Sequence, residues 1–395
     1  MLRTLNIIND YCLYLLVFSV TFEKWDPFQL VGTVSVTFIT TILYFGTWVP
    51  LIGTNFQFAP FKKFVIPLLY LILVGFICSA INSEYVTEMK LAYNYRTLLL
   101  IVLMTFVAAH IYCKPKVLPL VLNSYVASML LVSLLVSQGN GVTYVNDRLL
   151  LFGENPNVMG AKAALAFLIA ISRLINKFSI TRLIILGAIC IPFIALVAMS
   201  GSRGAFISIF LGLAVLLYFK KMGVLQKWTL IVFAAFASVI LITYLLETNP
   251  LLAERFLNTV EKGDTGRSGV WNTAFNVIKD NIIIGAGFEG VLPRMYAYSG
   301  GVPLLPHNVF LYLYIATGLP GIILFLIFLA RLTKLLFAHF KRTGDSLNLV
   351  LFVIVVFNMA KQGGSIGKIL FWFFFAVLIG STAHMISKDQ HKKIT

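Results

Sequence analysis

Apolar runs of about 20 residues recur along the whole chain, and each is long enough to cross a bilayer as an α-helix. Hydrophobic residues make up 59% of the 395 residues and charged residues only 12%, which is about half the charged fraction of soluble domains. The pattern predicts one all-α polytopic membrane domain over residues 1–395, rather than a soluble domain with an anchor.

The apolar runs predict about twelve transmembrane helices. The expected spans are 5–22, 28–52, 64–82, 92–112, 117–137, 157–172, 183–200, 205–219, 228–246, 307–330, 347–361 and 367–386.

The loop charges predict the orientation of these spans. With the N-terminus in the cytoplasm, the loops and ends on that side hold eighteen basic residues against Asp345 and Asp389, with Asp10 near the inner interface. The outer half then holds thirteen basic and twelve acidic residues. Because Lys and Arg favour the cytoplasmic side, both termini are predicted to be cytoplasmic. The net charge of +16 is spread over short loops, so it indicates membrane orientation and no nucleic-acid partner.

One long polar segment interrupts the apolar pattern, from about Glu247 to Pro306 between the ninth and tenth spans. It contains five basic and six acidic residues and is predicted to face outward, to the periplasm, as are residues 138–156 and 200–204. An outward-facing site meets no ATP or sugar nucleotide. Group transfer there therefore needs a donor that is activated beforehand and carried across the membrane.

Arg203 lies in the short outer turn Ser200-Gly201-Ser202-Arg203-Gly204. It would open the next helix, where unpaired N–H groups and the helix dipole favour anions. A guanidinium adds a planar fork that suits phosphate. The alternative is an Arg side chain that only reaches lipid head groups.

Arg267 and Trp271 lie at the start of an expected amphipathic helix in the long loop. Apolar residues recur at helical spacing in Val270-Trp271-Ala274-Phe275-Val277-Ile278, which is typical of a helix at the membrane interface. Arg267 would stand in its first turn, either aimed into a cleft or solvated at the interface. The later Gly285-Ala286-Gly287 lacks a βαβ context, so it predicts a tight turn and not a dinucleotide site.

His307 opens the tenth span between Pro306 and Asn308, and it is the one histidine predicted on the outer face. An imidazole takes up or releases a proton near neutral pH. His307 is therefore the candidate for acid–base catalysis, and the alternative is a histidine that merely marks a helix boundary.

Lys162 is the one basic residue well inside an apolar run. Cations within a membrane are functional candidates, although a Lys side chain can also extend to the interface. The preceding Glu154-Asn155-Pro156-Asn157 predicts a helix cap. The carboxylates of the outer loops are scattered and the four cysteines show no paired spacing, so we expect no metal site, no disulfide and no cofactor.

Several of these motifs together resemble the O-antigen ligase/polymerase superfamily. They are Asn155-Pro156-Asn157, Ser202-Arg203-Gly204, Arg267 with Trp271, Gly285-Ala286-Gly287-Phe288, and His307-Asn308 followed after nine residues by Gly318-Leu319-Pro320-Gly321. The resemblance covers about residues 150–322. One departure is Ile282, where the family often has Pro.

The resemblance implies a GT-C glycosyltransferase fold and a glycan donor linked to undecaprenyl pyrophosphate. The acceptor is a lipid A–core sugar in the ligase branch, another lipid-linked repeat unit in the polymerase branch, and a protein hydroxyl in a third branch. Span number, length and the single dominant outer loop resemble the ligase most, which acts in the bacterial inner membrane in lipopolysaccharide biosynthesis.

The resulting hypothesis assigns roles to seven residues. Arg203 and Arg267 bind the donor pyrophosphate with Lys162 as an additional ligand, and His307 orients or deprotonates the acceptor hydroxyl without a metal ion. Asn308 holds His307 or the helix start. Asn157 and Trp271 are further candidates for substrate binding.

A lipid-linked-sugar transporter is the alternative from another class. It would need polar residues through the middle of the membrane, and often two related halves. The sequence contains no convincing repeat, which favours the enzyme.

Overall fold

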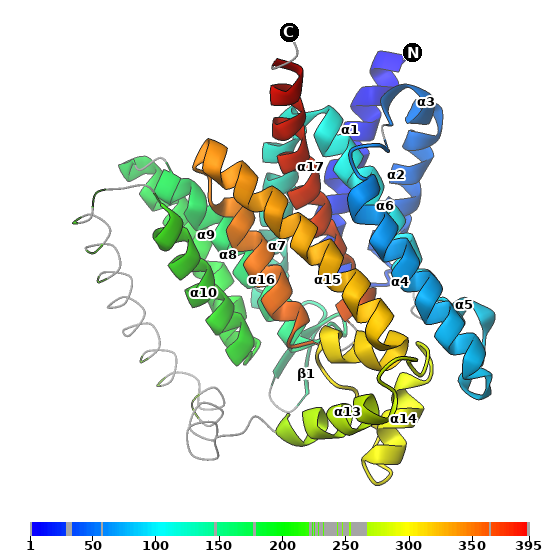
Figure 1. Cartoon of the computed structure of the whole chain (residues 1–395). Coiled ribbons are helices and arrows are strands. Elements are labelled where there is room, and N and C mark those ends of the chain that lie inside the picture. The colour runs from blue at the N-terminus through cyan, green and yellow to red at the C-terminus, as the bar shows by residue number, and fades with distance from the viewer. Residues whose placement is uncertain are drawn as a thin grey trace. The chain divides into compact units, whose positions relative to one another are not determined.

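The computed structural model describes residues 2–28, 34–56, 58–145, 148–176, 179–220, 267–362 and 365–392, with single positions between 223 and 253. The expected span 228–246 and most of residues 247–266 therefore lie outside the described part. Within it the chain is mostly helical (Figure 1), as the apolar runs predict.

The chain divides into two compact units, each made of separate stretches. The first comprises Met1–Asn55, Lys116–Gly263 and His339–Ile354. The second comprises Phe56–Pro115, Asp264–Ala338 and Val355–Thr395. The elements of the first unit are α1 (Leu2–Ser19), η1 (Val20–Phe22), α2 (Val36–Trp48), η2 (Val49–Leu51), α3 (Ile52–Asn55), α7 (Leu118–Ser137), β1 (Val142–Val145), β2 (Arg148–Leu151), α8 (Pro156–Asn176), α9 (Ile180–Met199) and α10 (Arg203–Phe219).

The second unit contains the helices that surround the end of the long polar segment. Its elements are α4 (Lys62–Ile81), η3 (Ser83–Tyr85), α5 (Met89–Ala92), α6 (Tyr95–Cys113), α13 (Ser268–Asp280), α14 (Val291–Tyr298), most of α15 (Val309–Thr343), the end of α16 (Leu347–Met359), η5 (Ser365–Gly367) and α17 (Ile369–Lys392). A further short helix, η4 (Pro115–Val117), precedes α7.

Six helices in the described part are long and apolar enough to cross a membrane, and five shorter apolar helices accompany them. These helices coincide with the eleven expected spans other than 228–246. The chain is therefore a multi-pass membrane protein, while the number of twelve crossings stays a prediction.

The start of α8 has the predicted cap. Asn155 Oδ1 accepts a hydrogen bond from the backbone N–H of Asn157 at 2.9 Å. Pro156 opens the helix, where the missing N–H of proline needs no partner.

A short antiparallel hairpin precedes this cap and departs from the all-α expectation. Strands β1 and β2 pair from Val142↔Leu151 to Val145↔Arg148. The ring of Phe152 then stacks on Trp25 at a centroid distance of 4.9 Å. The β-branched and aromatic run Val142-Thr143-Tyr144-Val145 was the sequence signal for a strand.

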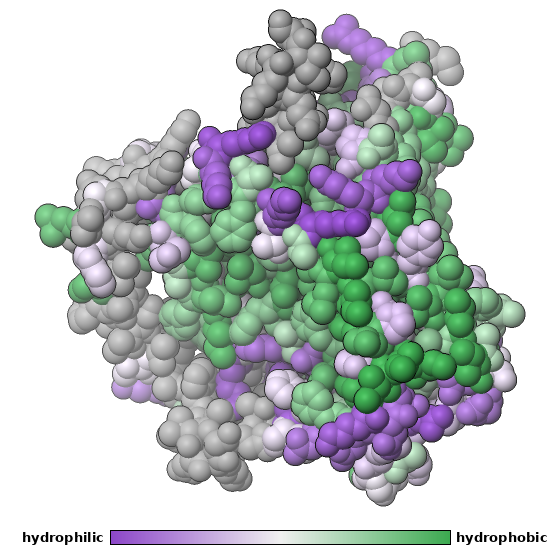
Figure 2. Space-filling view, viewed as in Figure 1, coloured by the Kyte–Doolittle hydropathy of each residue, from purple (hydrophilic) through white to green (hydrophobic). Residues whose placement is uncertain are grey.

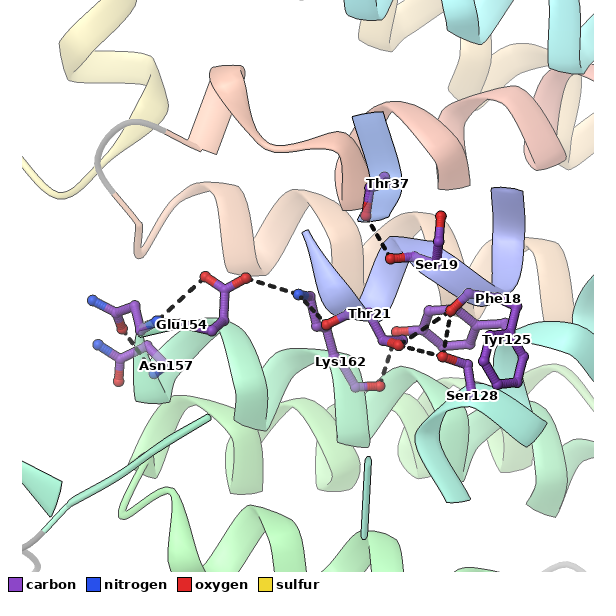
Figure 3. A network of polar contacts seen from close by, with 10 residues as sticks. Phe18, Ser19, Thr21, Thr37, Tyr125, Ser128, Glu154, Asn157 and Lys162 are labelled. Carbon is purple, nitrogen blue, oxygen red and sulfur yellow. Dashed lines mark hydrogen bonds and ion pairs between the residues drawn. The ribbon is translucent and has the colours of Figure 1, made fainter. Parts of the chain in front are cut away.

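Lys162 lies at the centre of a buried polar network in the first unit (Figure 3). Its Nζ donates to Glu154 Oε2 at 2.8 Å and to the Thr21 carbonyl at 3.1 Å. The side chains of Lys162 and Glu154 are 0% and 3% exposed. Tyr125 Oη donates to the Lys162 carbonyl at 3.0 Å. The network therefore connects α7, α8 and η1, and Lys162 does not extend to the interface.

In the second unit, α6 and α17 pack closely side by side. A Cβ on Gly380 would overlap the backbone of Ala108, so glycine permits this approach. In the first turn of α17, Trp372 Nε1 donates to the Ile366 carbonyl at 2.6 Å.

The outer surface of α15 suits a lipid environment. Leu319, Ile323 and Leu326 are exposed and recur at helical spacing, which places them on one face. Figure 2 shows hydrophobic residues over this part of α15 and hydrophilic residues gathered over α13 and α14.

The buried ion pair predicts a specific pattern of stability. Lys162→Met leaves the Glu154 carboxylate buried without its cation, and Glu154→Gln leaves the ammonium uncompensated. Each single change should reduce the free energy of unfolding by about 3–5 kcal/mol, whereas the double variant should recover most of that loss. Thermal unfolding of the purified protein in detergent measures this. Lys116→Met, at an exposed position of the same unit, should unfold like wild type. Single variants as stable as wild type would show that the pair does not form.

Candidate active site

The turn that carries Arg203 is held firmly in the first unit. Gly201 has a φ of +57°, which glycine adopts without strain. Ser200 and Ser202 are buried, and a Cβ on Gly160 of α8 would overlap Ser200 Oγ and the Ala205 methyl group. The turn therefore packs directly on α8, and Arg203, half-buried, begins α10 as predicted.

Asn157 and the same turn share one guanidinium that the sequence analysis did not select. Arg148 Nη2 donates to Asn157 Oδ1 at 2.8 Å, and its Nε donates to the Ser200 carbonyl at 3.1 Å. The Asn157 amide oxygen thus has a structural partner. Its predicted role in substrate binding stays a prediction.

Lys162 belongs to the interior of the same unit. Full burial and the ion pair with Glu154 give its ammonium group two protein acceptors. The sequence predicted that Lys162 is a functional cation or reaches the interface. It did not predict the ion pair with Glu154, which lies eight residues earlier. A role of Lys162 as an additional donor ligand stays a prediction.

Arg267 and Trp271 occupy the start of α13, as the periodicity predicts. Arg267 is the N-cap residue and is half-buried. Ala274, Val277 and Ile278 form the buried side of the helix. The indole Nε1 of Trp271 donates to the Pro306 carbonyl at 3.1 Å. The first turn of α13 is thereby tied to the residue that precedes His307.

The far end of α13 is tied to α15 by backbone hydrogen bonds. The N–H of Ala286 donates to the Ile315 carbonyl at 2.7 Å, and the N–H of Gly287 donates to the Ala316 carbonyl at 2.9 Å. In return, the Leu319 N–H donates to the Ile282 carbonyl at 2.9 Å. We call this set of three bonds the backbone interlock.

Proline and glycine explain why α15 has free carbonyls for the backbone interlock. Gly318 breaks the helix with φ +61° and ψ −166°. Pro320 has no N–H, so it cannot donate to the carbonyl of Ala316 four residues earlier. Gly287 supplies that donor. A Cβ on Gly285 would overlap the Ala316–Thr317 backbone, so the close approach requires glycine.

His307 has an unusual backbone and a perturbed side chain. Its φ is +46°, a left-handed conformation that is uncommon for residues other than glycine. The side chain is exposed, but neighbouring residues displace part of its water. This partial desolvation lowers the pKa below the ordinary 6.5, and the positive charge of Arg267 lowers the pKa further. The imidazole is therefore neutral near pH 7 and has a lone pair that accepts a proton.

Asn308 fixes the start of α15. Its Oδ1 accepts hydrogen bonds from the backbone N–H groups of Phe310 at 2.9 Å and Leu311 at 3.4 Å. This is the N-cap geometry that satisfies unpaired donors of a first helical turn. Of the two roles predicted for Asn308, the structure bears out the one at the helix start.

The predicted residues thus form one group in each unit. In the first unit, Arg148 joins Asn157 to the turn that carries Arg203. Arg267, Trp271, His307 and Asn308 are joined through Pro306 and α15 in the second. The second group places a guanidinium within electrostatic range of a neutral imidazole, a pair that suits an anionic leaving group and a proton to be removed.

The carboxylates form no evident metal site among the described residues. No group of three His, Cys, Asp or Glu side chains lies close enough there to hold an ion. Glu254, Glu261 and Asp264 lie outside the described part. Metal independence stays a prediction.

Comparison with known proteins identifies part of the chain. A family model described as O-antigen ligase matches residues 188–326. A chain from a solved structure described as "Structural coordination of polymerization and crosslinking by a peptidoglycan synthase complex" is 15% identical, with a TM-score of 0.47, covering 80% of this chain and 96% of that chain. This similarity is too distant to assign a fold or a function. No curated protein matches significantly.

The family match includes most of the motifs that suggested it. Arg203, Arg267, Trp271, His307 and Asn308 all fall within residues 188–326. The motif at Asn155-Pro156-Asn157 and Lys162 precede the matched region. This match supports the resemblance predicted from the sequence: residues 188–326 are similar to the O-antigen ligase family.

Proposed function

We propose that this protein is an O-antigen ligase of the bacterial inner membrane. It transfers a polysaccharide from undecaprenyl pyrophosphate to a sugar hydroxyl of lipid A–core in lipopolysaccharide biosynthesis. Both termini lie in the cytoplasm, and the residues that act on the glycan face the periplasm. The fold is of the GT-C type with twelve transmembrane helices, and α13 and α14 are interfacial helices of the periplasmic loop 247–306.

The donor supplies the free energy of the transfer. The bond between the anomeric carbon and the pyrophosphate oxygen breaks, and its electron pair stays on undecaprenyl pyrophosphate. Arg203 and Arg267 offset the charge that grows on this leaving group. Because the leaving group carries that charge itself, the guanidinium groups suffice and no metal ion is required.

The acceptor hydroxyl supplies the nucleophile. Its oxygen forms the new bond to the anomeric carbon while His307 removes its proton. A histidine whose pKa lies below the working pH holds its lone pair free to take this proton. The lowered pKa of His307 meets this requirement.

One contact carries this proposal: Trp271 Nε1 bonds the Pro306 carbonyl at 3.1 Å and so ties the start of α13, which carries Arg267, to the residue before His307. The charge of Arg267 accordingly lowers the pKa of His307. A transporter would not need a positioned base beside a guanidinium. A polymerase would use the same pair on a different acceptor. The one dominant outer loop that the sequence predicts favours the ligase over the polymerase.

The cellular test is a lipopolysaccharide gel from a strain in which this gene is deleted. We expect the deletion to leave lipid A–core without long-chain glycan, which then accumulates on the polyprenyl carrier. Wild type should restore the ladder. Arg203→Ala, Arg267→Ala and His307→Ala should lower transfer by about 100-fold or more, at unchanged protein levels. Lys at either arginine should rescue poorly, because the fork geometry is lost.

Two outcomes of this gel would contradict parts of the proposal. A ladder from Arg267→Ala equal to wild type would remove Arg267 from the mechanism. Core that bears a single repeat unit in the deletion strain would identify a polymerase. Lys279→Ala, which removes an exposed cation at the other end of α13, is the matched control and should restore the ladder.

The electrostatic interaction with Arg267 predicts how His307 titrates. Diethyl pyrocarbonate modifies the neutral imidazole, so its rate of reaction with His307, followed by peptide mass spectrometry, reports the pKa. In wild type the rate should fall only as the pH drops below the ordinary value of 6.5. In Arg267→Gln it should fall at a higher pH, because the nearby cation no longer opposes protonation. Desolvation, the larger cause, remains, so the pKa should stay below 6.5. Lys279→Gln should titrate like wild type, and an unchanged profile in Arg267→Gln would show that the two groups do not interact.

A further inference from the structure

Arg148 bridges the two backbone features that position the first group of site residues. Its Nε bonds the Ser200 carbonyl in the turn before α10, and its Nη2 bonds Asn157 Oδ1 at the start of α8. A guanidinium is planar, so two bonds from one group fix the direction as well as the separation of its partners. The start of α8 and the Arg203 turn are therefore held in one geometry.

The turn that carries Arg203 is stabilised in part by the hydrogen bond from Arg148. Ser202, the N-cap residue of α10, makes no side-chain cap hydrogen bond, although serine often does so at this position. Within the turn, the Ser202 N–H bonds Ser200 Oγ at 3.2 Å. The Ser200 carbonyl is fixed by Arg148.

The other anchor of Arg148 is held by the buried ion pair. The Asn157 N–H bonds Asn155 Oδ1, and the Asn155 N–H bonds Glu154 Oε1 at 3.2 Å. Glu154 Oε2 receives the Lys162 ammonium group, which also bonds the carbonyl of Thr21. Figure 3 shows this line of contacts from Asn157 through Glu154 to Lys162. The start of α8 is thus fixed to the interior of the unit.

The backbone of Arg148 is fixed as well. Arg148 pairs with Val145 at one end of the hairpin. Leu149 and Leu151 of the same strand are buried. The following Phe152 stacks on Trp25. Strand β2, which carries Arg148, is therefore fixed in place.

We propose that Arg148 is a positioning residue that sets the place of Arg203. This inference rests on the proposed function, in which Arg203 binds the donor pyrophosphate. The Glu154–Lys162 ion pair supports Arg148 by fixing the Asn157 end of its bridge. Arg148 acts through the Arg203 turn, because its Nε bonds the Ser200 carbonyl of that turn and its Nη2 bonds Asn157 Oδ1 at the start of α8.

A double-mutant cycle tests the proposal. The purified protein is assayed with a polyprenyl-pyrophosphate-linked glycan and lipid A–core, and kcat and KM for the glycan donor are measured. Arg148→Gln should lower kcat/KM by about 10- to 100-fold in the wild-type background, as expected when a binding group is misplaced by a fraction of an ångström. In the Arg203→Lys background the same change should cost less than about twofold, because the positioned fork is already lost.

Conservative variants separate positioning from charge. Arg148→Lys keeps the cation but not the planar fork, so it should behave like Arg148→Gln. Asn157→Ala removes one end of the bridge and should show the same coupling to Arg203→Lys, which keeps the test valid if Arg148→Gln folds poorly. Arg182→Gln, at an exposed arginine in the first turn of α9, is the control and should retain wild-type kcat and KM.

The outcomes distinguish this inference from the proposed function. Equal losses in both backgrounds, or full rescue by Arg148→Lys, would mean that Arg148 does not act through Arg203 and would overturn the inference. Wild-type kinetics of Arg148→Gln, together with an inactive Arg203→Ala, would overturn it and leave the function intact. An active Arg203→Ala would overturn the donor-binding role of Arg203 itself.

Discussion

The backbone interlock between residues 282–287 and α15 is the constraint on which the second group of site residues depends. Gly318 and Pro320 leave carbonyls of α15 without hydrogen-bond donors from the helix itself. The backbone N–H groups of the turn after α13 donate to these carbonyls. Buried backbone groups need hydrogen-bond partners within the protein, and residues 285–287 and 315–318 are buried, so the break in α15 and the turn stabilise each other. Both ends of α13 are then fixed relative to α15, one by the backbone interlock and the other by Trp271. His307 keeps its left-handed backbone and Arg267 stays within electrostatic range as a result.

The two groups of residues differ in the group that lies near their basic side chain. Inside the first unit, the Lys162 ammonium is matched by a carboxylate and a carbonyl, so the pair fixes structure and carries little net charge. In the second unit Arg267 meets a neutral imidazole, and its charge lowers the pKa of His307. A guanidinium is suited to an anionic substrate. We therefore propose that Lys162 serves mainly the scaffold of the site and that Arg267 serves its chemistry.

Local patterns in the sequence predicted much of this arrangement. Apolar runs predicted the helices, the periodicity after Arg267 predicted α13, and Asn155-Pro156 predicted a cap. The family motifs selected Arg267 and His307. The remaining features depend on contacts between distant parts of the chain. Arg148 gains its role from an asparagine and a serine carbonyl that only the folded unit brings to it. A single sequence does not show which distant residues an arginine such as Arg148 will contact.

Reconstituted transfer would show directly whether this protein joins a glycan to lipid A–core. The purified protein in proteoliposomes would receive a glycan on undecaprenyl pyrophosphate together with lipid A–core, and mass spectrometry would follow both lipids. The account predicts core that carries the glycan and an equal amount of released undecaprenyl pyrophosphate, without added metal ion. Glycan that lengthens on its carrier while the core stays bare would contradict the account.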